Sequence, residues 1–219
     1  MTVVAIDGPA GAGKSSVAVA TARVLGWDYV DTGALYRALA LAALEQGIDP
    51  ADGHTLGRLA ADIELSLDRD RVKLAGRDVT ARIRGEDVTA IVSTISAHPS
   101  VRAALVARQR ALARGGGVVM EGRDIGTVVV PEARLKIFLT ATLDERARRR
   151  ARQLGLPEDS AELAALEVSI ARRDEADSAR RESPLQAAED AVVVDSTDRD
   201  LDDVVAEIVA RVRRVLDGA

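Results

Sequence analysis

A glycine-rich segment near the start of the chain has the residue types and the spacing that bind phosphate groups. Residues 8–15 fit the pattern G-x-x-x-x-G-K-[ST], in which backbone N–H groups surround a phosphate. An apolar run at 3–7 precedes this segment, and a helix-like stretch from 17 to 25 follows it. A helix that starts directly after such a loop adds its positive N-terminal end to the site. We therefore predict a loop that holds the phosphates of a nucleoside triphosphate.

Two side chains of this segment have the chemistry of phosphoryl transfer. The Lys14 ammonium is a compact charge that can reach the β- and γ-phosphates, and the Ser15 hydroxyl can complete the ligand shell of a bound Mg²⁺. The residues expected to form the triphosphate site are Gly8, Pro9, Ala10, Gly11, Ala12, Gly13, Lys14, Ser15 and Ser16.

Basic side chains also follow two further strand-like segments, at positions where a doubly wound sheet binds ligands. Thr32 and Arg37 come after the second apolar run, where they can hydrogen-bond and clamp an anion. Arg123 and Asp124 follow the third run, on the same edge of the predicted sheet, and a third group of charges lies at 173–180. This pattern indicates phosphoryl transfer, because two phosphates that repel each other must be neutralised and held in line.

Five short apolar runs indicate the fold class. They lie at 3–7, 28–31, 117–121, 135–139 and 191–195, and helix-like sequence separates them. This alternation predicts an α/β fold with a doubly wound, parallel five-stranded sheet. We also expect helices that end at Gly26 and Gly47, and a helix that starts at Pro99.

One segment departs from this alternation between the second and third runs. Residues 63–83 predict a small antiparallel β subdomain, with strands at 63–67, 72–74 and 79–81 and turns at 68–70 and 76–77. A long decorated surface loop is the alternative interpretation.

A second departure is an arginine-rich helix from 144 to 152. A break at 154–157 separates it from another helix, which we expect from 158 to roughly 173. Arg146 and Arg150 are one helical turn apart on the same face, so both can point at the same anion.

The remaining arginines of this segment have a plainer interpretation. Arg148 and Arg152 lie on another face of the helix, where we expect them to be solvated. Without phosphates the like charges of the segment should repel one another, so we predict a flap that opens when empty and closes on its ligands.

Composition excludes several classes of function. The formal net charge is -5 and aromatic residues make up 2 %, so neither a general attraction for nucleic acid nor a base-stacking platform is expected. The chain has no cysteine and two histidines, which disfavours a disulfide framework, a thiolate metal site and a histidine-rich zinc site. No apolar run approaches the ~18 residues that cross a bilayer. We expect a cytoplasmic monomer with small-molecule substrates and neither nucleic-acid nor membrane partners.

With these residues identified, the chain closely resembles the bacterial cytidylate kinases, of the nucleoside monophosphate kinase group. The resemblance covers almost the whole chain and rests on the phosphate-binding segment and on blocks at 31–37, 93–102, 121–127 and 180–185. The phosphate-binding segment occurs in many families, but the other four blocks in this order are highly specific. The resemblance implies transfer of the γ-phosphoryl group of ATP, with Mg²⁺, to CMP or dCMP, giving ADP and CDP or dCDP.

The resemblance also implies one P-loop kinase domain with three parts, which fit the two departures described above. The core would comprise 1–37, 115–141 and 190–219. A mobile monophosphate-binding insertion would cover roughly 38–114, and a lid with its following helix roughly 142–180.

Carried over residue by residue, the resemblance assigns the candidates to the two substrates. Thr32, Arg37 and Arg123 would hold the acceptor phosphate. The residues that would contact cytosine are Ser93, Arg102, Asp124 and Arg180, those that would reach the ribose are Arg173 and Asp177, and Tyr36 completes the CMP site. The residues that would stabilise the transferring group are Lys14, Arg123, Arg146 and Arg150, and Arg146 can also stack on adenine. Thr32 stands where some members have serine, and Ala176 where some have arginine, which changes the charge of the lid side.

Asp124 has a reason of its own to recognise cytosine. A carboxylate accepts a hydrogen bond from the 4-amino group of cytosine, whereas the 4-oxo group of uracil would face it lone pair to lone pair. Alternatives remain for two sites: Asp124 can cap a turn, and Asp177 with Arg180 can form a surface ion pair on a helix.

Other functions also use a triphosphate-binding loop. A GTP switch would carry an N-K-x-D motif, which this sequence lacks. A nucleotide sensor without enzymatic activity would not need the acceptor clamp of Arg37, Arg123 and Asp124. A P-loop kinase of another small acceptor, such as UMP or shikimate, remains the alternative to CMP phosphorylation.

Overall fold

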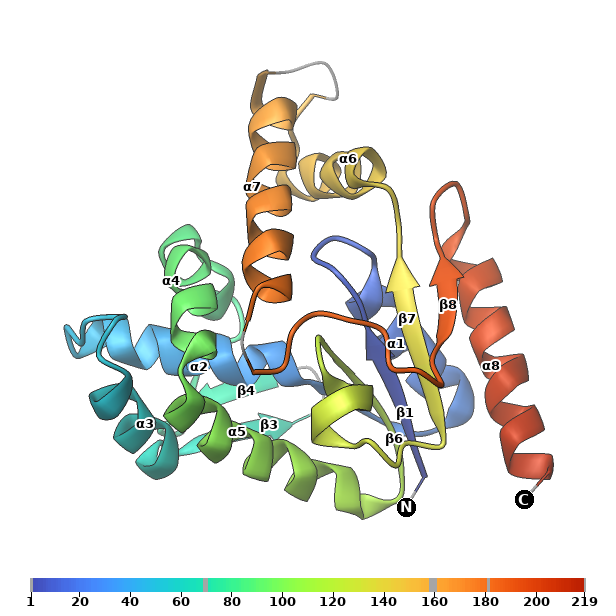
Figure 1. The fold of residues 1–219 in the computed structure, drawn as a ribbon, viewed down its shortest axis with the longest axis horizontal. Coiled ribbons are helices and arrows are strands. Elements are labelled where there is room, and N and C mark those ends of the chain that lie inside the picture. The colour runs from blue at the N-terminus through green and yellow to red at the C-terminus, as the bar shows by residue number, and fades with distance from the viewer. Residues whose placement is uncertain (1, 69–70, 158–160, 181, 219) are drawn as a thin grey trace. The chain divides into compact units, whose positions relative to one another are not determined.

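The computed structural model describes residues 2–68, 71–157, 161–180 and 182–218 (Figure 1). These residues form two compact units. Unit 1 comprises Met1–Asp28 and Gly116–Ala219, and unit 2 comprises Tyr29–Gly115.

A five-stranded sheet has the strand order β2-β6-β1-β7-β8. Its strands are β1 (Thr2–Asp7), β2 (Asp28–Asp31), β6 (Gly117–Gly122), β7 (Leu135–Thr140) and β8 (Val192–Asp195), and the boundary between the units falls within β2. β1 runs parallel to β6 and β7, and β7 runs parallel to β8. The predicted fold class is confirmed, and each of the five apolar runs corresponds to one of these strands.

The helices of unit 1 follow the strands in the alternating order that the sequence predicts. They are α1 (Lys14–Leu25), α6 (Leu143–Leu154), α7 (Ala161–Ser178) and α8 (Leu201–Asp217), together with a single π-helical turn, η3 (Ile125–Val129). α1 ends at Gly26, as predicted, in a left-handed conformation with φ of 68°. α1 packs against α8 and β6, and the buried face of α8 supplies Val204, Val205, Ile208, Val209 and Val212.

The second helix of the arginine-rich segment is longer than predicted. Its expected start at 158 lies outside the described residues, and α7 continues to Ser178 instead of ending near 173. The expected end was wrong because the segment up to Ser178 contains neither glycine nor proline, so nothing in it interrupts the helix. The charged group at 173–180 therefore belongs mostly to the last turns of α7.

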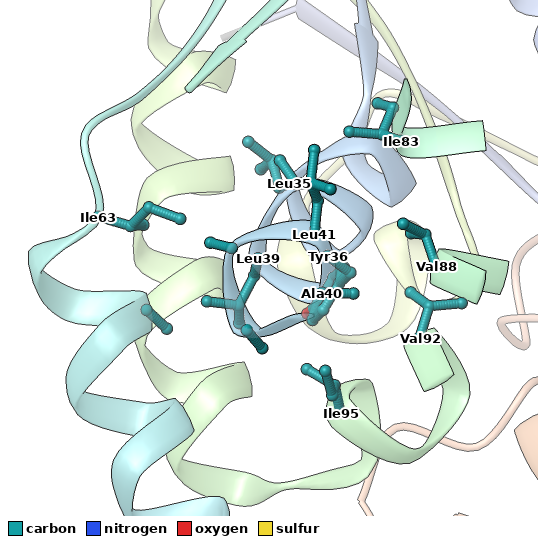
Figure 2. Packing of buried hydrophobic residues seen from close by; sticks show 14 of the residues in the cluster. Leu35, Tyr36, Leu39, Ala40, Leu41, Ile63, Ile83, Val88, Val92 and Ile95 are labelled. Carbon is teal, nitrogen blue, oxygen red and sulfur yellow. The ribbon is translucent and has the colours of Figure 1, made fainter. Parts of the chain in front are cut away.

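Unit 2 is built around the alanine- and leucine-rich helix α2 (Thr32–Glu45). The other helices of this unit are α3 (Gly53–Asp62), α4 (Glu86–Ala97) and α5 (Pro99–Leu112), with short 3₁₀ turns η1 (Arg82–Arg84) and η2 (Ala113–Gly115). Figure 2 shows Leu35, Leu39 and Leu41 of α2 within the apolar core of this unit. As predicted, α5 starts at Pro99, and Gly47 lies just beyond α2 in a left-handed conformation with φ of 65°.

The small antiparallel sheet of unit 2 comprises β3 (Leu65–Asp68), β4 (Arg71–Leu74) and β5 (Arg77–Asp78). The sheet is confirmed, but the predicted third strand at 79–81 is wrong. Ala75 and Gly76 both have positive φ, 47° and 76°, so a tight turn ends there and the strand resumes at Arg77. Asp78 then accepts the Thr80 N–H at 2.9 Å, which turns the chain out of the sheet.

In the part of the chain that the structure describes, no single helix has the length and apolarity to span a bilayer. Among these residues, only the bent pair Glu86–Ala97 and Pro99–Gly115 together has them by length and composition, across a bend of 97°.

Candidate active site

Residues 8–13 connect β1 to α1, and close contacts on two sides require glycine in this loop. Gly8 has a φ of 149°, and a Cβ atom there would lie 2.0 Å from the carbonyl oxygen of Leu139 on β7. Gly11 has a φ of 79°, and a Cβ atom there would lie 3.0 Å from Cβ of Arg146 on α6. The loop therefore depends on glycine to fit beside both β7 and α6.

Lys14, the first residue of α1, is buried against this loop. Its Nζ donates a hydrogen bond of 2.6 Å to the carbonyl oxygen of Pro9. Burial and the positive charge of Arg123 hold the pKa of Lys14 well below its usual range, and the negative charge of Glu121 opposes this effect. A polyphosphate bound at the loop would favour the protonated amine, because its negative charge offsets the burial and the repulsion.

Asp7, the last residue of β1, binds the segment that follows β6. Its two carboxylate oxygens accept the N–H groups of Ile125 and Gly126, each at 2.8 Å. Burial raises the pKa of Asp7 to about 6, although the two hydrogen bonds act in the opposite direction. Asp7 was not among the predicted site residues, although an aspartate that ends an otherwise apolar strand is a signal visible in the sequence.

Arg123 and Asp124 follow β6 directly. Arg123 donates from Nη1 to the carbonyl oxygen of Gly122 at 3.2 Å and from Nε to the Asp177 carboxylate at 3.0 Å. Asp124 is 6 % exposed and precedes η3, but its side chain makes no capping hydrogen bond to the described residues of that turn. Capping of this turn therefore does not account for Asp124.

Two arginines converge on Asp177 in the last turn of α7. Arg123 reaches it from the end of β6, and Arg180 reaches it from just beyond the helix. Asp177 is 1 % exposed, so the ion pair with Arg180 that the sequence permits is present but buried. Arg173, one turn earlier on α7, adds positive charge that further lowers the pKa of Lys14.

Arg146 on α6 contacts the phosphate loop. Its Nη1 donates to the carbonyl oxygen of Ala10 at 2.9 Å and to the carboxylate of Asp174, and its Nε donates to the carbonyl oxygen of Ala141 at 3.1 Å. Asp174, on α7, also accepts the Ala10 N–H at 3.2 Å. Asp174 was not among the predicted site residues, because nothing in the sequence shows that α7 returns to the loop.

Arg150 has a different environment from Arg146. It is half-buried, and its Nη1 donates to Oε1 of Gln153 at 3.3 Å, so the two arginines have different partners in this structure. Arg149, which the sequence analysis did not select, donates to Oγ of Ser196 at 2.9 Å and to its carbonyl oxygen at 2.6 Å. The signal for Arg149 was weak, because every position from 148 to 150 is arginine.

Carboxylates of α6 and α7 form ion pairs with Arg146, Arg148, Arg149 and Arg152, whereas Arg150 contacts Gln153. The predicted repulsion of like charges is therefore largely offset in this structure, because acidic residues on the first turn of α6 and on α7 supply counter-charges. The exposed side chains of Arg148 and Arg152, at 47 % and 56 %, confirm that these two are solvated. The ion pairs are Arg146 with Asp174, Arg148 with Asp144, Arg149 with Glu145, and Arg152 with Glu145.

A pocket of about 570 Å³ lies beside the phosphate loop. It is lined by Gly13 and Ser16 at the start of α1, by Arg149 on α6, and by Ser196 and Asp198 after β8. Its volume falls within the range of small-ligand sites, and its wall offers hydroxyl, guanidinium and backbone groups. This pocket was not predicted, because its walls come from three segments that are distant in the sequence.

Unit 2 carries the other predicted acceptor residues. Thr32 is the buried first residue of α2. Arg37, further along α2, donates from Nη1 to Oγ1 of Thr89 at 2.9 Å and to the carbonyl oxygen of Ile83 at 3.3 Å. Thr89 was not predicted, and it orients the guanidinium group of Arg37.

The predicted base-contacting residues of unit 2 lie on three helices. The guanidinium carbon of Arg102, on α5, lies 5.8 Å from the ring centroid of Tyr36 on α2, a cation–π arrangement. Both residues are buried. Ser93 is half-buried on α4.

The oxygen groups around α1 fit a magnesium ion that is held partly by a nucleotide. Mg²⁺ prefers hard oxygen ligands and usually binds through one or two protein groups and substrate phosphates. Ser15 offers an exposed hydroxyl on the first turn of α1, and Glu121 is a buried carboxylate near Lys14. Within the described residues, no group of three or more histidine, cysteine or acidic side chains forms a metal cage.

Comparisons with known proteins identify close relatives of the chain and its fold. The family model described as cytidylate kinase matches residues 4–214. A cytidylate kinase of Symbiobacterium thermophilum is 50 % identical over 97 % of this chain and 96 % of its own length. One of Mycolicibacterium paratuberculosis is 54 % identical over 90 % of this chain and 88 % of its own length. A gluconokinase structure from Sinorhizobium meliloti, at 17 % identity, covers 99 % of this chain and 94 % of its own with a TM-score of 0.53, which shows a shared fold alone.

Proposed function

Because the chain belongs to the cytidylate kinase family, we propose that it transfers the γ-phosphoryl group of ATP to CMP and dCMP. The observation that carries this proposal is the position of Lys14, which is buried against the phosphate loop with its Nζ 2.6 Å from the carbonyl oxygen of Pro9. Burial lowers the pKa of this amine, and the positive charges of Arg123 and Arg173 lower it further. Such crowding of positive charge is costly in the empty protein. It becomes favourable when two phosphate groups lie beside these cations, as phosphoryl transfer requires.

Transfer to a phosphate oxygen requires few catalytic groups from the protein. The acceptor oxygen is already anionic at neutral pH, so no general base is needed and no covalent enzyme intermediate has to form. Lys14 and Arg123 stabilise the charge that spreads over the transferring group, and Arg146 and Arg150 are the lid arginines proposed to assist them. Ser15 would help to hold a Mg²⁺ ion together with the ATP phosphates, and that ion would supply further charge neutralisation.

Recognition of the acceptor divides between its phosphate and its base. Thr32, Arg37 and Arg123 are proposed to hold the phosphate. Asp124 is proposed to accept from the cytosine 4-amino group, and its burial supports this role, since a buried carboxylate discriminates strongly between a donor and an acceptor. The remaining proposed contacts are Tyr36, Ser93, Arg102 and Arg180 around the base, and Arg173 and Asp177 at the ribose.

The pocket beside the phosphate loop is the proposed adenine site. It adjoins Gly13 and Ser16, so a nucleotide whose phosphates lie in the loop can place its base there. Arg149 lines this pocket, whereas Arg146 is bound to Ala10 and Asp174. This favours Arg149 over Arg146 as the arginine that contacts adenine.

These roles assign each of the two substrates to particular parts of the chain. We assign the triphosphate to unit 1. The ten proposed acceptor contacts divide equally: five belong to unit 2, which contains the proposed monophosphate-binding insertion, and five belong to unit 1. The helix pair α6 and α7 is the proposed lid, which would exclude water as a competing acceptor.

An acceptor panel tests the proposed function. ADP formation from ATP is measured with CMP, dCMP, UMP, AMP and shikimate, and an identically purified Lys14→Ala protein controls for contaminating kinases. The proposal predicts the highest kcat/KM with CMP or dCMP. A higher kcat/KM with UMP, AMP or shikimate would overturn it.

A further inference from the structure

Asp7 binds the segment after β6 at two points on either side of Arg123 and Asp124. In the parallel register of β1 and β6, Asp7 is paired with Gly122. Its carboxylate accepts the N–H groups of the two residues after Asp124, which are 118 and 119 residues away in the sequence, each at 2.8 Å. Arg123 and Asp124 are the two residues between these anchor points. Asp7 therefore fixes the backbone on both sides of them.

The side chain of Asp7 is placed to act on this segment and not on a substrate. It is 5 % exposed, and each of its oxygens is directed at a backbone amide. The first N–H groups of a helical turn have no partner within the turn, and Asp124 does not supply one to the described residues of η3. Asp7 supplies both partners from the neighbouring strand.

The same residue is directly attached to the phosphate loop. Asp7 precedes Gly8, whose backbone packs against the carbonyl oxygen of Leu139. Asp7 therefore connects two parts of the proposed site. Its backbone leads into the phosphate loop, and its carboxylate binds the segment that carries Arg123 and Asp124. Its raised pKa of about 6 shows that the fold keeps it buried at an electrostatic cost.

We propose that Asp7 is a positioning residue that sets base specificity by holding Asp124 in the orientation that accepts from cytosine. This inference rests on the proposed function. Asp7 acts through backbone contacts, so its loss should change the choice between CMP and UMP more than the binding of ATP. A purely structural residue would instead lower activity with both acceptors equally.

Asp7→Asn is the most direct variant, because the side chain keeps its size. The single oxygen of the asparagine side chain can accept the N–H of either Ile125 or Gly126. The NH₂ group of the side chain then faces the other N–H donor, so one of the two hydrogen bonds is lost. Asp52→Asn is the matched control: Asp52 also caps a helix, accepting the Thr55 N–H at 3.0 Å on α3, and α3 carries no proposed site residue.

The experiment compares kcat/KM for CMP and UMP in five proteins: wild type, Asp7→Asn, Asp124→Ala, the double variant and the control Asp52→Asn. We expect Asp7→Asn to lower the CMP to UMP ratio by about tenfold, with a small change in KM for ATP. In the Asp124→Ala background the same substitution should lower the ratio no further, because the residue through which it acts is gone. Asp52→Asn should leave the ratio unchanged.

Each other outcome has a distinct meaning. A wild-type enzyme without a preference for CMP overturns the proposed function itself. A wild-type preference that survives in Asp7→Asn, or an equal loss with both acceptors, overturns the inference on Asp7 alone. Asp7→Ser, whose hydroxyl can accept from one amide without a charge, is the second variant. If neither variant folds, Asp7 is a requirement of the fold and the specificity role is rejected.

Discussion

Arg146 and Asp174, which lie 28 residues apart on α6 and α7, form a largely buried ion pair that binds both polar backbone groups of Ala10. Arg146 donates to the carbonyl oxygen of Ala10, and Asp174 accepts from its N–H. This pair therefore fastens two helices to the middle of the phosphate loop. The contact links the proposed lid to the loop that is proposed to hold the ATP phosphates.

Asp174→Asn should destabilise the protein, because Arg146 would remain buried without a counter-charge. We expect the free energy of unfolding in urea to fall by about 2–3 kcal/mol. Asp144→Asn is the matched control, since it breaks an exposed pair with Arg148 and should change the free energy by less than about 0.5 kcal/mol. Equal effects of the two substitutions would show that the contact with Ala10 does not stabilise the fold.

Lys14→Ala should abolish turnover and leave the fold intact. The lost charge would raise the activation free energy of transfer by on the order of 3 kcal/mol or more, which is measured as a lower kcat. Stability should not fall, because burial already disfavours the charged form of Lys14. The checks are kcat and the circular dichroism spectrum, with Lys73→Ala on β4 as the control. Activity of a folded Lys14→Ala protein within about tenfold of wild type would count against the phosphate-loop assignment.

Arg149→Ala tests the adenine pocket. Arg149 lines that pocket, so its loss should raise KM for ATP by about tenfold and affect KM for CMP much less. The neighbouring Arg148 has an exposed side chain and is the control, with an unchanged KM for ATP expected for Arg148→Ala. If both variants bind ATP as wild type does, adenine does not use this pocket.

The sequence predicts the elements whose signals are local. Five apolar runs marked the strands, and Gly26 ended α1, because an apolar run and a glycine at a helix end are patterns of adjacent residues. The third strand of the small sheet was misplaced for a similar local reason: Ala75 adopts a positive φ that glycine usually provides.

Whether a site residue could be predicted depended on how far its contact partners lie from it in the sequence. Lys14 lies within a recognisable motif, but the roles of Asp7, Asp174 and Arg149 depend on contacts with segments distant in the sequence. The sequence does not show that α7 returns to the phosphate loop, so Asp174 emerges only from the structure. Asp7 had one local signal, an aspartate at the end of an apolar strand, but its partners 118 and 119 residues away emerge only from the structure.

The pH dependence of stability reports directly on Asp7. Its pKa is about 6 in the folded protein against 3.8 as the ordinary value, so the native state binds the Asp7 proton more tightly than the unfolded state does. Its contribution to stability must then fall as pH rises from about 4 to about 6. We expect the free energy of unfolding of wild type, minus that of Asp7→Asn, to fall by about 3 kcal/mol over this range. A difference that stays constant or rises would contradict the raised pKa.

The most direct test of the account is the acceptor specificity of Asp124→Ala. This substitution removes a partner of the cytosine 4-amino group and also a repulsion against the uracil 4-oxo group. The value of kcat/KM should therefore fall for CMP and rise for UMP. We predict that the ratio of kcat/KM for CMP to that for UMP falls by roughly 10². An unchanged ratio in a folded Asp124→Ala protein would contradict the claim that Asp124 selects cytosine.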